Sequence, residues 1–117
     1  MQIDISALSF PLTPAIARHV HDRIEGALAV FAAPRIRGVM ARLRDINGIR
    51  GGVDKRCRFV AWLDGRKTVV ADAVDRDLYV AVDIAAAKLK RSLWRLLRRS
   101  RTLRREHGNR PLRRLVS

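Results

Sequence analysis

Five basic residues near the C-terminus recur at the spacing of one helix face. They are Lys88, Arg91, Arg95, Arg98 and Arg99. At about 100° of rotation per residue they share a single arc, and none of them has an acidic residue four positions away. Like charges this close repel one another and weaken a helix. The arrangement therefore favours a polyanion, such as the phosphates of a nucleic acid, over an ordinary solvated face.

Two tryptophans accompany basic residues. Trp94 falls beside the basic arc, where it could stack on a base or a ribose. Packing over a neighbouring side chain or the tail is the alternative. Trp62 and Val60 lie on the open face of the predicted sheet, beside arginines at positions 42, 44, 56 and 58. This face is a candidate second binding surface or dimer patch, although tryptophan is also a common strand former.

Side chains suited to catalysis or metal binding are few and isolated. His19 and His21 lie on the polar side of a predicted helix without a third ligand at metal spacing, so we expect two exposed histidines. The lone Cys57 alternates with core residues and has no histidine partner, which predicts a buried structural thiol. Gly51-Gly52 is followed by Val53, not by the glutamine of peptidyl-tRNA-hydrolysing loops. The sequence therefore predicts no enzyme, no metal site, no cofactor and no small-molecule substrate.

The charge of the whole chain points the same way. Its 117 residues include 25 basic and 11 acidic ones, for a net charge of +14, and only four of the 25 are lysines. Residues 1–87 contribute +3 and residues 88–117 contribute +11. Arginine suits bidentate phosphate contacts, so the expected partner is RNA, DNA or an anionic membrane surface. We expect one domain over 1–106 and a flexible basic tail over 107–117.

The N-terminus lacks a basic region followed by an apolar run, so we expect no signal peptide. No apolar run approaches the length of a membrane span. We therefore predict a cytoplasmic protein with Cys57 reduced.

Six elements must position these residues. Alternation of apolar and polar residues predicts strands, and apolar residues three or four apart predict helices. The predicted strands cover about 2–7, 39–44, 56–63 and 67–74, and the predicted helices cover about 14–32 and 78–105. Local signals define their ends. Thr13 is expected to cap the first helix and Asp75 the last, Asp64-Gly65 predicts a two-residue hairpin, and 45–54 reads as a turn or loop.

The apolar stripes of both helices need one sheet face to cover. Val20 and Ile24 belong to the first stripe, and Val82, Leu89 and Leu93 belong to the second. The expected fold is therefore α+β with the order β-α-β-β-β-α, a four-stranded mixed sheet and both helices on one face.

Several short motifs, in this order and spacing, resemble a known family over about residues 1–105. They are Leu12-Thr13-Pro14-Ala15-Ile16 and Arg18-His19-Val20 with Asp22-Arg23, then Asp77-Leu78-Tyr79 with Ala81-Val82-Asp83, then Lys88-Leu89 with Arg91, Leu93, Arg95, Leu96 and Arg99. The chain resembles the ribosome hibernation-promoting factors and ribosome-associated translation inhibitors, also called sigma-54 modulation proteins, in their short form. We expect no counterpart of the long form's C-terminal dimerisation domain.

The resemblance implies a double-stranded-RNA-binding-domain-like fold and a stress-response role. Such proteins bind small-subunit rRNA in the channel of mRNA and tRNA and silence idle ribosomes. The resemblance implies that five basic residues contact rRNA, namely Arg23, Lys88, Arg91, Arg95 and Arg99. From the position of the basic arc we add Arg98 and Trp94 to the candidate RNA-binding residues. Gly26 and Ala29 stand where members often carry lysines, so the first helix should contribute less.

Two alternatives from other classes remain at this point. One is a DNA- or nucleoid-binding protein that uses the same basic helix. The other is a protein that binds an anionic membrane surface, which fits poorly because the apolar stripe of the last helix is needed to cover the sheet.

Overall fold

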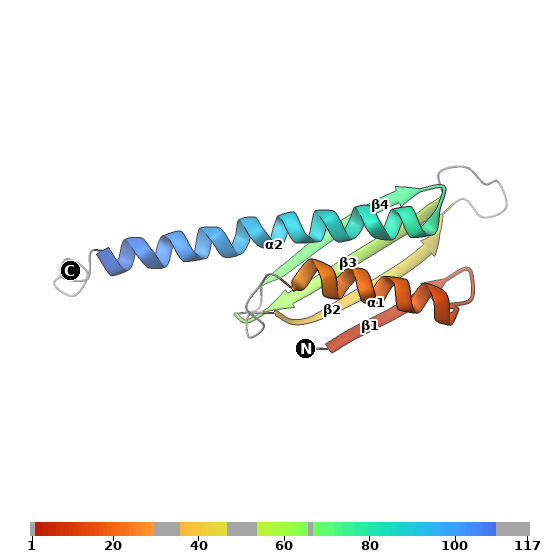
Figure 1. The fold of residues 1–117 in the computed structure, drawn as a ribbon, viewed down its shortest axis with the longest axis horizontal. Helices are drawn as coiled ribbons and strands as arrows, with labels where there is room; N and C mark the ends of the chain where they lie inside the picture. The colour runs from red at the N-terminus through yellow and green to blue at the C-terminus, as the bar shows by residue number, and fades with distance from the viewer. Residues whose placement is uncertain (1, 30–35, 47–53, 66, 110–117) are drawn as a thin grey trace.

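The computed structural model describes residues 2–29, 36–46, 54–65 and 67–109, with side chains described as far as residue 96. Four strands and two helices follow in the order β-α-β-β-β-α (Figure 1). Their bounds are β1 Gln2–Leu8, α1 Pro14–Leu28, β2 Ile36–Asp45, β3 Lys55–Leu63, β4 Thr68–Asp75 and α2 Leu78–Asn109. The predicted α+β order is confirmed.

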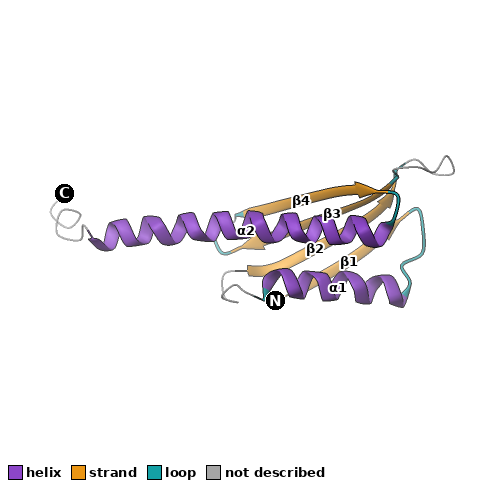
Figure 2. Cartoon of the chain, turned by 45° about the horizontal axis from the view of Figure 1, so that its top comes forward, coloured by secondary structure: helices purple, strands orange, loops and turns teal. Residues whose placement is uncertain are grey.

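The strands form one mixed sheet in the spatial order β1-β2-β3-β4. β1 runs parallel to β2. β3 pairs with β2 on one side and with β4 on the other, and both pairings are antiparallel. Both helices cover the same face of this sheet, as Figure 2 shows from a second direction. The other face stays open, and α2 extends well past the end of the sheet (Figure 1). No described helix is long and apolar enough to cross a membrane.

The core lies between the helices and the covered face of the sheet. Every second residue of β3 is buried there, from Cys57 and Phe59 to Ala61, as the alternation predicts. α1 contributes Val20 and Ile24, both fully buried. α2 contributes six buried residues among those described, and they include the stripe Val82, Ala85, Leu89 and Leu93. Phe31, which continues the helical spacing of Val20 and Ile24 in the sequence, lies outside the described residues.

The two helices begin with different capping residues, one predicted and one not. Thr13 caps α1, because its Oγ1 accepts a hydrogen bond from the Ile16 N–H at 3.2 Å. At α2 the prediction of Asp75 is wrong. The cap is Asp77, whose Oδ1 accepts from the Tyr79 N–H at 2.9 Å. Asp75 instead accepts from the Asp77 N–H at 2.9 Å, so it orders the turn that leads into the cap.

Three predicted ends differ from the observed ones. The β3–β4 hairpin closes at a hydrogen bond from the Leu63 N–H to the Lys67 carbonyl, so its connection is one residue longer than predicted. A two-residue type I′ turn needs a positive φ at both central residues, and here Gly65 has one but Asp64 does not.

α1 ends at Leu28, and residues 30–35 lie outside the description. α2 runs to Asn109 through Gly108, four residues past the expected end.

Burial of Cys57 allows a direct test of the core. The change Cys57→Ser keeps the shape of the side chain but places a hydroxyl without a designated partner in a fully buried position. We expect the free energy of unfolding to fall by about 1–3 kcal/mol, measured by urea denaturation with an unchanged m-value. Cys57→Ala removes the sulfur without adding a polar atom and should cost less. Rapid reaction of the native thiol with a thiol reagent would contradict the burial.

Candidate nucleic-acid interface

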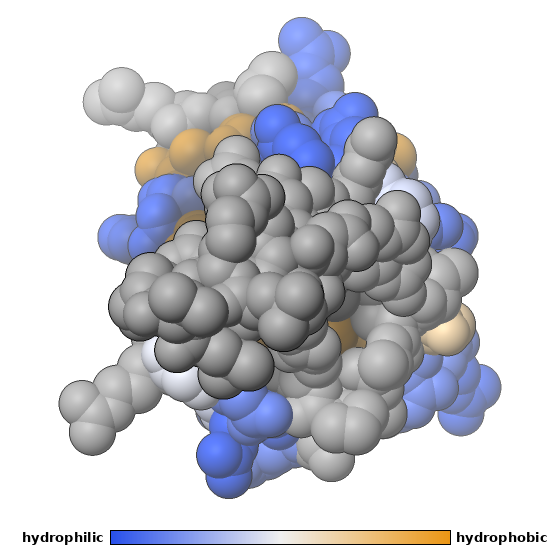
Figure 3. All heavy atoms as spheres, turned by 90° about the vertical axis from the view of Figure 1, so that its left-hand side faces the viewer, coloured by the Kyte–Doolittle hydropathy of each residue, from blue (hydrophilic) through white to orange (hydrophobic). Residues whose placement is uncertain are grey.

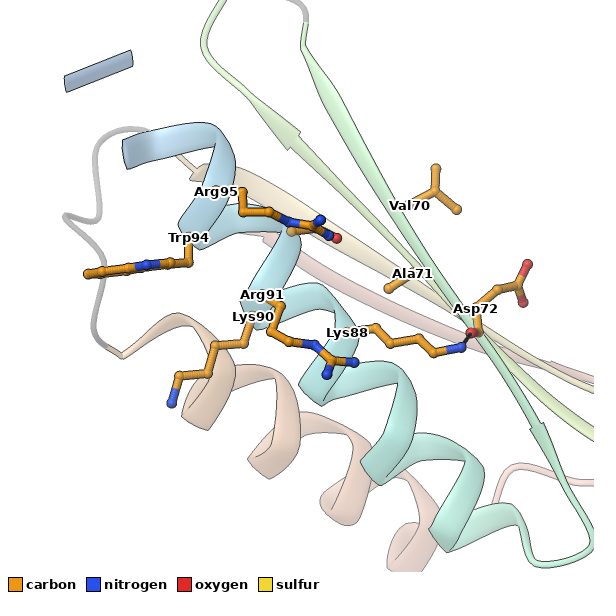
Figure 4. A pocket seen from close by; sticks show the side chains of 9 residues that line it. Val70, Ala71, Asp72, Lys88, Lys90, Arg91, Trp94 and Arg95 are labelled. Carbon is orange, nitrogen blue, oxygen red and sulfur yellow. Dashed lines mark hydrogen bonds between the residues drawn. The ribbon is translucent and has the colours of Figure 1, made fainter. Parts of the chain in front are cut away.

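A groove of about 800 Å³ runs between α2 and the outer edge of β4. Figure 4 shows the side chains that line it. They are Val70, Ala71 and Asp72 from β4 and Lys88, Lys90, Arg91, Ser92, Trp94 and Arg95 from α2. Four of the residues predicted to bind RNA are therefore brought together, namely Lys88, Arg91, Trp94 and Arg95.

Lys88 attaches α2 to the sheet edge. Its Nζ donates to the backbone carbonyl oxygen of Asp72 at 3.0 Å. β4 has a strand neighbour on one side only and is therefore an edge strand of the sheet. A lysine over an exposed edge also discourages the pairing of another strand. Lys88 thus adds positive charge to the groove and helps to fix its width.

Arg91 and Arg95 supply the exposed charge of the groove. They lie one helical turn apart, are both exposed, and lie on the side of α2 that faces β4 (Figure 4). Within the described residues neither has a hydrogen-bonded or ion-paired carboxylate. Because a guanidinium presents donors in a fixed fork, two neighbouring ones on a rigid helix can bind adjacent phosphate oxygens.

Trp94 and Lys90 point away from β4, around the helix from Arg91 and Arg95 (Figure 4). The Trp94 side chain is 53% exposed. Arg98 and Arg99 follow later in α2, but their side chains lie outside the description.

Arg23 lies apart from the groove. Its Nε donates to Asp83 Oδ1 at 2.8 Å, and His19 Nε2 lies 2.8 Å from the same oxygen. The His19 ring also meets the Tyr79 ring edge-on, with centroids 4.8 Å apart. This cluster joins α1 to α2, so the prediction of an exposed His19 is wrong; of the two histidines of α1, only His21 is exposed. Arg23 remains half exposed, so it keeps donors for a second partner.

The open face of the sheet carries a second charged cluster. The Asp72 carboxylate accepts two hydrogen bonds from Arg56, at 2.9 and 2.7 Å, and two from Arg58, at 3.1 and 3.0 Å. The hydrogen bonds from Arg56, helped by those from Arg58, lower the pKa of Asp72 below its ordinary value. Asp72 therefore makes contacts with two surfaces. Its backbone carbonyl accepts a hydrogen bond from Lys88 of α2, and its side chain binds two arginines of the open face.

Cys57 offers no reactive thiolate. Burial, with a smaller effect of the Asp72 charge, raises the pKa of its thiol to about 12, whereas nucleophilic cysteines have a lowered pKa. Among the described residues, no three side chains of His, Cys, Asp or Glu come together as metal ligands.

Sequence reasoning missed the β4 wall of the groove and Lys90. Lys90 lies outside the predicted arc, at about 120° from Leu78, although its charge was a visible signal. Val70, Ala71 and Asp72 gave no signal, because only the packing of α2 beside β4 makes them part of the same surface.

Comparisons with known proteins agree with the fold. Residues 3–101 match the family model described as Sigma 54 modulation protein / S30EA ribosomal protein. A ribosomal subunit interface protein from Coxiella burnetii has a similar structure, with a TM-score of 0.69, 18% identity, and 82% of this chain and 97% of that chain covered. The N-terminal domain of Thermus thermophilus Protein Y gives a TM-score of 0.66, 20% identity, and 81% and 94% coverage. No curated protein sequence matches.

The Asp72 cluster predicts a specific acid sensitivity. Because its folded-state pKa lies below the ordinary 3.8, the unfolded chain takes up this proton first as the pH falls. The stability from Asp72 is thus complete above about pH 5 and is lost as the pH falls through 3.8 and below. We expect the difference in unfolding free energy between the native chain and Asp72→Asn to shrink over that range, in urea titrations from about pH 7 to about pH 2.

Asp64→Asn is the matched control. Asp64 lies 3.5 Å from Arg37 in a well-exposed pair, so its removal should change stability little at any pH. A difference for Asp72→Asn that stays constant down to about pH 2 would mean that the arginines do not stabilise its charged form.

Proposed function

The chain belongs to the Sigma 54 modulation protein / S30EA ribosomal protein family of ribosome-associated factors, and we propose that it binds small-subunit rRNA and inhibits translation. The binding site is the channel used by mRNA and tRNA, and inhibition is steric exclusion. The family is one of ribosome-associated factors rather than a class of enzymes. In this proposal the protein is cytoplasmic. It binds ribosomes under stress and keeps them in a hibernating, inactive state.

The observation that carries the proposal is the pair Arg91 and Arg95 on a rigid helix beside the β4 edge. Both side chains are exposed, and among the described residues neither pairs with a carboxylate, so both guanidinium groups are ready for phosphates. The buried stripe that ends in Leu93 holds this part of α2 against the sheet. The site therefore meets RNA without first ordering its backbone, which would cost about 1–2 kcal/mol per residue.

The shape of α2 supports binding within a channel. Its 32 residues correspond to about 48 Å of helix, and its C-terminal part extends past the sheet (Figure 1). Arg98 and Arg99 belong to that part, so the proposed contacts continue along α2 from the groove. A protein held there by phosphate contacts would occupy space that mRNA or tRNA needs, and inhibition requires no bond to be made or broken.

DNA binding by the same helix is the alternative function. Phosphate contacts alone do not separate RNA from DNA, so the family membership is what favours the ribosome. Sedimentation of a cell lysate through a sucrose gradient separates the two. Comigration with ribosomal particles supports the proposal, and comigration with the nucleoid supports the alternative.

If the groove binds rRNA, the loss of arginines in the groove should weaken ribosome binding more than the loss of arginines elsewhere in the chain. The double change Arg91→Gln and Arg95→Gln should weaken binding to purified small subunits about tenfold or more, because it removes charged hydrogen bonds to phosphates. The slope of log K against log salt concentration should fall by about 0.7–0.9 for each phosphate that the variant no longer binds. Both quantities follow from binding titrations at several salt concentrations.

The control is the double change Arg113→Gln and Arg114→Gln, which removes the same amount of positive charge. Both positions lie outside the described residues. The control should weaken binding less. Equal effects of the two variants would mean that net charge, rather than the helix surface, drives the interaction.

Steric exclusion predicts a dependence on the order of addition. In a purified translation system, the protein should lower synthesis when it meets small subunits first. Prior addition of excess mRNA and initiator tRNA should blunt the effect, because the channel is already occupied. The measurement is the amount of product formed in each order, and inhibition that does not depend on the order would rule out exclusion.

A further inference from the structure

The open face of the sheet carries four arginines that the groove does not use. Arg42 and Arg44 lie on β2 directly opposite Arg58 and Arg56 of β3. Like charges directly opposite across two strands destabilise a sheet, and here two such pairs are adjacent. The face therefore holds an arrangement that the fold itself does not favour.

Asp72 pairs with only two of these four arginines, and its single negative charge offsets only one of their four positive charges. It binds Arg56 and Arg58 from the next strand. Arg42 and Arg44 are exposed, and within the described residues no hydrogen bond or ion pair engages their side chains. An anion supplied from outside would pair with Arg42 and Arg44 on β2, as Asp72 pairs with Arg56 and Arg58 on β3.

An aromatic platform lies on the same face, farther along β3 than Arg58. Trp62 pairs with Gly38 across the β2–β3 ladder, and a Cβ at position 38 would overlap the Trp62 ring. The indole thus occupies the space above a residue without a side chain. It is partly exposed, so a flat group can stack on its outer surface.

Apolar side chains lie between the platform and the arginines. Met40 pairs with Val60, and Val60 pairs with Val70. Val70 is 51% exposed. In Figure 3, apolar and hydrophilic surfaces lie next to each other on the left-hand side of the view, the back of the sheet in Figure 1.

We propose that this open face, formed by Arg42, Arg44, Arg56, Arg58 and Trp62, is a second nucleic-acid-binding surface, and that it takes a single-stranded RNA segment. Arginines bind its phosphates and Trp62 stacks on an unpaired base. A flat face with an exposed ring suits an unpaired base better than a duplex, in which the bases stack on each other. A second copy bound face to face would bring arginines against arginines, so charge disfavours a dimer through this surface.

Arg42, Arg44 and Trp62 lie on the face of the sheet opposite α2 (Figure 2), and none of them lines the groove. Val70 and Asp72 of β4 border both surfaces. The protein can therefore hold two RNA segments at once. The inference stands independently of the proposed function, since the open face shares no arginine with the groove.

Binding to a fluorescein-labelled oligouridine of about 12 nucleotides, within the usual site sizes for single strands, tests the proposal on the full chain. Arg42→Gln with Arg44→Gln should weaken binding about fivefold or more in anisotropy titrations and lower the salt slope. The unfolding midpoint of this variant should not fall, because the change removes repulsion between strands.

The control, Arg18→Gln with Arg76→Gln, removes the same charge from two exposed positions on α1 and in the β4–α2 connection. It should weaken binding to the oligouridine less than the Arg42/Arg44 change does. Equal effects of variant and control would overturn the proposal.

Fluorescence of Trp62 provides a second measurement. In a Trp94→Phe background, Trp62 is the only tryptophan, and the oligouridine should quench it in parallel with the anisotropy change. An unchanged Trp62 signal at saturation would overturn the stacking assignment. If the Arg42/Arg44 change alters self-association in analytical ultracentrifugation but leaves the affinity for the oligouridine intact, the face binds a second copy and the proposal is wrong. Small-subunit binding by the Arg91/Arg95 variant tests the proposed function separately.

Discussion

Packing of the buried stripe of α2 on the sheet is the constraint on which the rest of the structure depends. Val82, Ala85, Leu89 and Leu93 are buried within about three helical turns. The sheet meets them with small residues, including Ala71 and Ala73 of β4, which allow the helix to approach closely. Once this stripe faces the sheet, the rotation of α2 is fixed. Arg91 and Arg95 must then emerge beside the β4 edge, because they lie on the adjacent part of the helix surface.

The acidic residues of the folded part are largely engaged within the chain. Asp72 binds Arg56 and Arg58, and Asp83 binds His19 and Arg23. Asp45 and Asp54 both bind Lys55, at 3.0 and 3.1 Å. Asp77 caps α2. With the carboxylates used in this way, the positive charge of α2 and of the β2 arginines stays directed at solvent, which suits a polyanionic partner.

Much of the fold was predictable because buried residues recur at the regular spacing of a strand or a helix in the sequence. Alternation in β3 predicts that Cys57 and Phe59 face the core, and both are fully buried. Helical spacing predicts the stripes of both helices, and Thr13 is recognisable as a cap from its type and position. The side that carries Arg91 and Arg95 also follows from the sequence, since a helix with one buried stripe leaves a defined polar arc.

Tertiary structure alone decided which partners these residues have. Lys88 reaches a backbone carbonyl 16 residues away, and His19 reaches Asp83 across 64 residues. Such contacts depend on how separate elements lie against each other, which no local period encodes. The same reason explains the choice of Asp77 over Asp75 as the α2 cap, since the path of the chain out of β4 selects between two suitable carboxylates. The sequence by itself determined the elements, their buried faces and the basic arc; the packing of α2 against β4 turned that arc into a groove.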